Sequence, residues 1–156
     1  MSNSSSPCMS PISPSTPEKV WAALTDGKLS REYWGGRQVE SDWKRGSPVR
    51  FRKLSGEHDM VRATVAEAAP PDRLIMLWTY ELTPGAEMPP PQRVTYTIEA
   101  AAPENAKLTV LHEGVEGNPI DDGLRNGWPA ILSSLKSYLE TGTALEVTRQ
   151  WAREGK

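Results

Sequence analysis

The sequence predicts an α+β domain in which a curved antiparallel sheet wraps around one long helix near the C-terminus. Apolar residues recur with the period of a helix over one long stretch, Asp121 to Gly142. Before it, from Arg37 to Val115, the period changes to two. Short turns separate these alternating stretches, which is typical of consecutive antiparallel strands.

The predicted long helix has an apolar stripe at steps of three and four residues and a polar opposite face. Asp121 and Asp122 place negative charge at its start, and Gly142 follows it as a C-cap. Pro129 interrupts the pattern, so the helix either begins at Pro129 or bends there, with Trp128 on the apolar face. The stripe consists of Leu124, Trp128, Ile131, Leu132, Leu135, Tyr138 and Leu139.

Two short helices are predicted ahead of the sheet. Ser15 or Thr16 is the expected N-cap of the first helix, and Pro17 suits its first position. Thr25 and Asp26 begin a second helical turn, KLSREYW, which two glycines end.

The strands follow from alternation bounded by turn residues. Five or six are expected, all from adjacent segments and therefore antiparallel. In the fifth, Val94, Tyr96 and Ile98 face inward, and in the last Leu108, Val110 and His112 share a face. The loop Thr83–Pro91 is either a lid or a long hairpin connection. The expected strands are Gln38–Trp43, Val49–Leu54, Met60–Ala68, Arg73–Leu82, Gln92–Ala101 and Ala106–Val115.

Composition narrows the class of protein. The 156 residues fit one domain, expected over 13–142, after a Ser/Pro-rich arm or poor edge strand over 1–12 and before a C-terminal tail over 143–156. The 18 basic and 20 acidic side chains give a net charge of −2 without like-charge blocks, so neither nucleic acid nor a membrane surface is an expected partner. The single cysteine and the absence of an apolar leader or membrane-length run favour a soluble cytoplasmic protein.

Seven segments, in order, resemble the family of activators of heat-shock-protein ATPase (AHSA-type), within the START-like (SRPBCC) helix-grip superfamily. The resemblance runs from about Ser13 to Gly142. It implies a curved antiparallel sheet that grips the C-terminal helix, with a cavity between them. The usual apolar first strand is replaced here by PCMSPIS, whose prolines restrict it to a sheet edge. The segments are TPEKVWAALTD, YWGG, ESDWKRGSPVRF, PPDRLIMLW, VTYTIE, KLTVLHEG and GWPAILSSLKSYLETG.

Aromatic residues are the candidate lining of that cavity. Tryptophan and tyrosine fill space and keep a hydrogen-bonding group, and ligand pockets are mostly apolar with a few polar groups. His112 either orients a polar ligand group or acts as a base, or it is a core histidine bonded to the backbone or to a tyrosine. The same aromatic set also fits a plain core. The candidates are Trp34, Trp43, Phe51, Trp78, Tyr96, His112, Trp128, Ile131 and Leu135.

Other constellations are weaker. His58 lies in the turn GEHD and is expected to be solvated. No cofactor motif, phosphate loop or paired cysteine is present, so no cofactor is expected. Carboxylates near the start of the long helix complement its dipole, and no metal is assigned to them. These carboxylates are Glu113, Glu116, Asp121 and Asp122. A separate group of arginines lies on the presumed outer face of the sheet: Arg50, Arg52 and Arg62.

Three functions remain open from the sequence. The first is binding of a small hydrophobic or aromatic ligand between the sheet and the C-terminal helix. The second is a protein-interaction role, such as association with a chaperone in a stress response, which the family resemblance implies. The third is a cyclase-like or hydrolase-like enzyme that uses His112, although no catalytic constellation is evident. A monomer or a homodimer is compatible with each.

Overall fold

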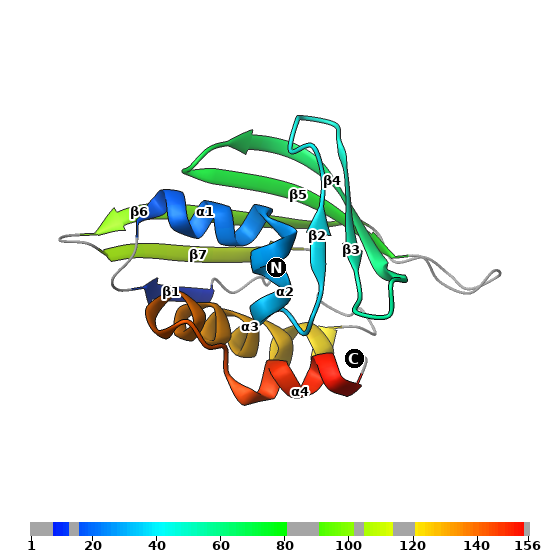
Figure 1. Cartoon of the computed structure of the whole chain (residues 1–156). Helices are drawn as coiled ribbons and strands as arrows, with labels where there is room; N and C mark the ends of the chain where they lie inside the picture. Colours follow the sequence, from blue (N-terminus) through cyan, green and yellow to red (C-terminus); the bar gives the residue numbers. More distant parts are fainter. Residues whose placement is uncertain (1–7, 13–15, 81–90, 102–104, 114–120, 155–156) are drawn as a thin grey trace.

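The computed structural model describes residues 8–12, 16–80, 91–101, 105–113 and 121–154. Within these residues the chain forms one seven-stranded antiparallel sheet and four helices (Figure 1). The strands are β1 (Cys8–Ile12), β2 (Gln38–Glu40), β3 (Pro48–Arg52), β4 (His58–Ala69), β5 (Arg73–Tyr80), β6 (Gln92–Ala101) and β7 (Asn105–Glu113). The helices are α1 (Pro17–Thr25), α2 (Gly27–Tyr33), α3 (Asp121–Thr141) and α4 (Glu146–Glu154).

The sheet has the order β1-β7-β6-β5-β4-β3-β2, so six consecutive strands form a meander and β1 is added at the far edge. Register shifts occur between Arg50 and Arg52 in β3 and between Val65 and Glu67 in β4. Such irregularities bend a strand and increase its twist. In Figure 1 the sheet curves over the helices, and α3 lies beside β1 with α4 below it. The α+β helix-grip arrangement is confirmed.

The helix ends follow the expected chemistry. Thr16 caps α1, because its Oγ1 accepts a hydrogen bond from Lys19 N at 3.2 Å, and Pro17 is the first helical residue. Asp26 caps α2 in the same way, through a 2.9 Å bond from Lys28 N. At the end of α3, Gly142 has a φ of 87° and its N–H donates to Tyr138 O at 2.8 Å, as a glycine C-cap does.

The core lies between one face of the sheet and helices α1, α2 and α3. Strand alternation fills the sheet side: Val94, Tyr96 and Ile98 are buried in β6, as are Leu108 and Val110 in β7. The helices contribute Val20, Ala23, Leu24, Tyr33, Ile131, Leu132 and Leu135. None of the helices in the described part of the chain is both long and apolar enough to cross a membrane.

Two predicted strands end earlier than expected. The first stops at Glu40 because Ser41 Oγ accepts from Trp43 N at 3.0 Å, and Trp43 takes a left-handed φ of 58°. The second stops at Arg52 because Lys53 begins a turn and donates to Glu57 O at 2.8 Å. The ends of two later predicted strands, residues 81–82 and 114–115, and most of the expected 83–91 loop lie outside the described residues.

Both chain ends also differ from expectation. The arm expected over 1–12 includes β1, which pairs with β7 as the poor edge strand that was the alternative, and residues 1–7 lie outside the described residues. The expected tail over 143–156 contains α4, which packs on α3 because Ala144 and Thr148 are buried. Pro129 lies inside α3, so the helix does not begin there.

Candidate functional site

Six of the predicted residues form one aromatic cluster between the sheet and α3. Trp34 follows α2, and Trp128 lies on α3. The strands β3, β5, β6 and β7 supply the rest. Ring centroids in contact are 5.2 to 6.4 Å apart, the separation at which aromatic pairs attract. The aromatic cluster consists of Trp34, Phe51, Trp78, Tyr96, His112 and Trp128.

Trp78 and Trp128 are the centre of this aromatic cluster. Trp78 contacts His112 edge-on at 5.2 Å and Trp128 at 5.7 Å. Trp128 also contacts Trp34 at 5.6 Å and Tyr96 at 6.1 Å. Both indoles are almost fully buried, with 4% and 5% of their surface exposed. The sheet and α3 therefore meet through tilted and edge-on rings.

A chain of hydrogen bonds fixes His112. The indole Nε1–H of Trp128 donates to His112 Nδ1 at 2.9 Å, and His112 Nε2 lies 2.7 Å from Gln92 Oε1. An indole N–H is only a donor, so Nδ1 is the acceptor and the imidazole proton is on Nε2, which donates to Gln92. His112 is thus a neutral core histidine. Among the described residues, the imidazole bonds to Gln92 and Trp128.

Two polar atoms at the aromatic cluster have no hydrogen-bond partner among the described residues: Trp78 Nε1 and Tyr96 Oη. Both side chains are more than nine-tenths buried. Burial raises the pKa of Tyr96 well above its ordinary value, with a smaller contribution from nearby Tyr33, so its hydroxyl keeps its proton. Buried polar groups in folded proteins are nearly always hydrogen-bonded, so both atoms need an explanation.

The remaining predicted site residues have different surroundings. Ile131 and Leu135 are buried on the same face of α3 as Trp128. Trp43 is half-buried and packs at the edge of the core, where its indole donates to Thr25 O at 3.0 Å. In the described part of the chain it makes no ring contact with the aromatic cluster. Trp43 therefore braces the end of α1.

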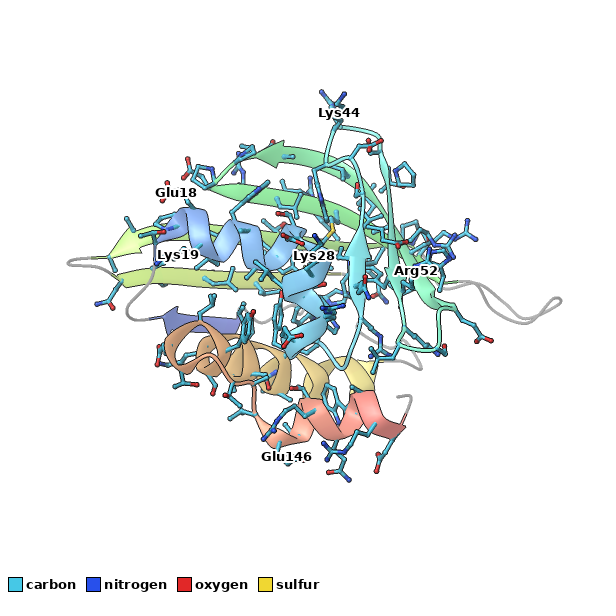
Figure 2. All side chains as sticks on the ribbon, in the orientation of Figure 1. Glu18, Lys19, Lys28, Lys44, Arg52 and Glu146 are labelled. Atoms are coloured by element: carbon cyan, nitrogen blue, oxygen red, sulfur yellow. The ribbon has the colours of Figure 1, made fainter. Side chains whose placement is uncertain are left out.

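The charged residues that the sequence singles out lie on the surface, outside the aromatic cluster. His58 is exposed, as predicted, and contacts Glu40, which also accepts from Arg52 at 2.8 Å (Figure 2 labels Arg52). Arg50 and Arg62 are paired across β3 and β4, as expected for adjacent strands of the outer face. Among the residues that the structure describes, no group of three or more His, Cys, Asp or Glu is placed to hold a metal ion.

Two surface hollows lie elsewhere. One, of about 730 Å³, lies between the start of α1, where Figure 2 labels Glu18, and the ends of β4, β5 and β6. The other, of about 400 Å³, separates Leu54 from α4. Neither includes any of the buried atoms that lack a partner in the described residues. The aromatic cluster, which contains Trp78 Nε1 and Tyr96 Oη, is the candidate functional site.

Sequence reasoning missed Gln92 as a member of this site. Gln92 is fully buried, whereas the sequence pattern indicates only that it begins a strand. The signal was present, because Gln92 has the same parity as Val94, Tyr96 and Ile98, the residues predicted to face inward. A polar residue at an inward position is either paired or functional.

A curved sheet that grips one long helix through an aromatic interior defines a START-like, helix-grip protein. The sequence profile of the family described as "Activator of Hsp90 ATPase homolog 1-like protein" matches residues 14–140. The chain belongs to this family. No curated protein matches the sequence significantly.

Solved structures show the same fold at low sequence identity. DynU16, a protein in the dynemicin biosynthetic locus, is 24% identical with a TM-score of 0.72; the match covers 92% of this chain and 49% of DynU16, so the chain spans about half the length of that protein. PFC0360w, an HSP90 activator from Plasmodium falciparum, is 18% identical (TM-score 0.62, 80% and 86% covered). The Aha1 dimer from Colwellia psychrerythraea is 17% identical (TM-score 0.70, 88% and 97% covered).

Proposed function

We propose that this protein binds a small aromatic or apolar molecule between the sheet and α3, at the aromatic cluster. Ligand sites of this kind are mostly apolar and contain a few placed polar groups. The cluster offers indole and phenyl faces from both layers, and the Trp128–His112–Gln92 chain holds its central rings in place.

The single observation that carries the proposal is the pair of buried atoms without a partner in the described residues, Trp78 Nε1 and Tyr96 Oη. A core that only stabilises the fold gains nothing from them, because each unpaired buried polar group costs about 1–3 kcal/mol. A ligand that hydrogen-bonds to either atom would recover that free energy on binding. The described rings are already in contact, so a ligand must part them or enter beside them.

The test is native mass spectrometry of the purified protein, followed by a thermal-shift screen with two-ring and three-ring aromatic compounds. A ligand at a hundred times its dissociation constant should stabilise the protein by about 2.7 kcal/mol, and the shift should grow with concentration. The control variant is Leu54→Ser, which should show the same ligand-dependent shift as the wild type, since Leu54 is 60% exposed and lies outside the aromatic cluster. A clean apo mass and no shift across the panel would overturn the proposal.

A second candidate is association with a chaperone. It is supported by the family description, which names an activator of Hsp90 ATPase, and by the fold shared with an HSP90 activator. A pull-down with purified Hsp90, with a measurement of its ATPase rate, tests it: no binding and an unchanged rate would exclude it.

The oligomeric state is a separate question. Light scattering decides between a monomer and a dimer like that of the Colwellia protein.

A further inference from the structure

We propose that the ligand is an aromatic molecule with an acceptor oxygen, such as a ring ketone, and that Trp78 Nε1–H and the hydroxyl of Tyr96 donate to it. This inference rests on the proposed function, because it assigns the chemical class of the ligand of the same site.

Trp78 can only donate, since the indole nitrogen carries one hydrogen and has no free lone pair for accepting. The rings in contact with Trp78 are those of Trp34, Phe51, His112 and Trp128. Of these, only the imidazole contains an acceptor, and its Nδ1 already accepts from Trp128. None of its ring neighbours therefore offers a free acceptor, and the indole N–H of Trp78 has no partner among the described residues.

Tyr96 is also poised as a donor. Its hydroxyl keeps its proton because burial opposes the phenolate, and Trp128 is its ring neighbour. Trp128 offers no acceptor, because an indole N–H can only donate, and this one donates to His112. Tyr33, the other tyrosine near it, uses its hydroxyl to donate to Ala23 O at 2.8 Å. A tyrosine hydroxyl can donate or accept, so an acceptor oxygen would satisfy Tyr96 as well as Trp78, which can only donate.

The two donors lie apart along the sheet, but both of their rings contact Trp128. Trp78 pairs with Gln92 and Leu74 pairs with Tyr96, so the two residues are four positions apart along neighbouring strands. At 3.3 Å per residue this is about 13 Å between backbone positions, and both side chains contact the indole of Trp128. A flat molecule that packs against Trp128 would present its acceptor oxygen to these donors, and a carbonyl oxygen has two lone pairs with which to accept.

The experiment compares molecules of one shape that differ in the acceptor: 9-fluorenone against fluorene, and benzophenone against diphenylmethane. Dissociation constants are measured by isothermal titration calorimetry on the intact protein. A ligand without the oxygen leaves a buried donor unpaired, so each ketone should bind about tenfold more tightly than its hydrocarbon partner. Tyr96→Phe or Trp78→Phe should each reduce this preference, while Trp21→Phe on α1 should keep it.

The outcomes separate this inference from the function on which it rests. If neither member of a pair binds, the proposed function fails together with its ligand class. If ketone and hydrocarbon bind equally, the site binds aromatic molecules but the acceptor assignment is wrong. Tyr96→Phe keeps the ring and removes only the oxygen, so it provides the test even if Trp78→Phe does not fold. An unchanged preference in Tyr96→Phe and in folded Trp78→Phe would also overturn the assignment.

Discussion

Replacing Tyr96 by phenylalanine tests the central observation directly, because the substitution removes one buried oxygen and keeps the ring. Tyr96 is 1% exposed, and its hydroxyl has no partner among the described residues. Tyr33 is the matched comparison: it is fully buried too, but its hydroxyl donates to the carbonyl of Ala23 at 2.8 Å. That carbonyl belongs to the last turn of α1, where helical partners run out.

The two substitutions should have opposite signs. An unsatisfied buried hydroxyl costs about 1–3 kcal/mol, so Tyr96→Phe should raise the free energy of unfolding of the ligand-free protein by about 1 kcal/mol. For a chain of this size that raises Tm by roughly 2–4 °C. Tyr33→Phe breaks a made bond and strips a helix-end carbonyl of its donor, so it should lower the free energy of unfolding by about 1 kcal/mol.

The assay is urea denaturation followed by circular dichroism, with thermal melts as the second measurement, on wild type and both variants at pH 7. Both variants lose the same atom from the same kind of ring, so their difference reports the hydrogen-bond partner. If Tyr96→Phe destabilises as much as Tyr33→Phe, the hydroxyl of Tyr96 has a partner in solution. That result would show that the hydroxyl of Tyr96 is satisfied without a ligand, and it would remove half of the support for the binding site.

Three further changes probe other contacts. Ser134→Ala removes the buried Oγ that lies 2.7 Å from Thr148 Oγ1, so hydrogen-exchange protection in α4 should fall about tenfold. His112→Phe removes the acceptor of the Trp128 indole, so urea denaturation should show a loss of about 2 kcal/mol. The hydrogen bond from Arg52, then that from His58, lowers the pKa of Glu40. The contribution of Glu40 to the free energy of unfolding is therefore present above the ordinary carboxyl pKa and is lost as pH falls through the lowered value. Glu40→Gln should abolish this pH-dependent contribution. The loss should be less than about 1 kcal/mol, because Glu40 and Arg52 are exposed.

Each of these predictions has a control and a contrary outcome. Ser133→Ala, one position away on the exposed side of α3, should leave exchange in α4 unchanged, and equal effects would disprove the Ser134 contact. His58→Gln should change stability much less than His112→Phe, because His58 is exposed. For Glu40, a stability curve between pH 3 and 6 that is parallel in wild type and Glu40→Gln would contradict the lowered pKa.

The sequence predicted the fold well where periodicity and capping agree. Strand β6 has the expected bounds, and Thr16, Pro17 and Gly142 have the predicted roles at helix ends. Those signals are local, because a cap or an alternation depends on a few neighbouring residues. The failures depend on contacts between distant segments. The left-handed backbone of Trp43 accompanies a hydrogen bond from its indole to the carbonyl of Thr25. Helix α4 is fixed by the contact of Thr148 with α3.

For the site, alternation could place Tyr96 and His112 on inward faces but could not say which side chains bond to each other. That His112 is shared between Gln92 and Trp128 depends on rotamers in three separate elements. Sequence patterns also could not show that the indole N–H of Trp78 is unpaired, because this depends on the hydrogen bonds that its neighbours make. Sequence patterns describe faces, whereas pairing within a face is settled by packing.

The position of β1 has a consequence for synthesis on the ribosome. Cys8 pairs with Val110, so β1 waits during translation for a partner made roughly 100 residues later. At about 5–20 residues per second this wait lasts on the order of 5–20 s. Pro11 removes one backbone donor from the waiting segment, which makes it a poor template for pairing with other nascent chains. The feature that weakens β1 as an edge strand thus protects the chain while it is still incomplete.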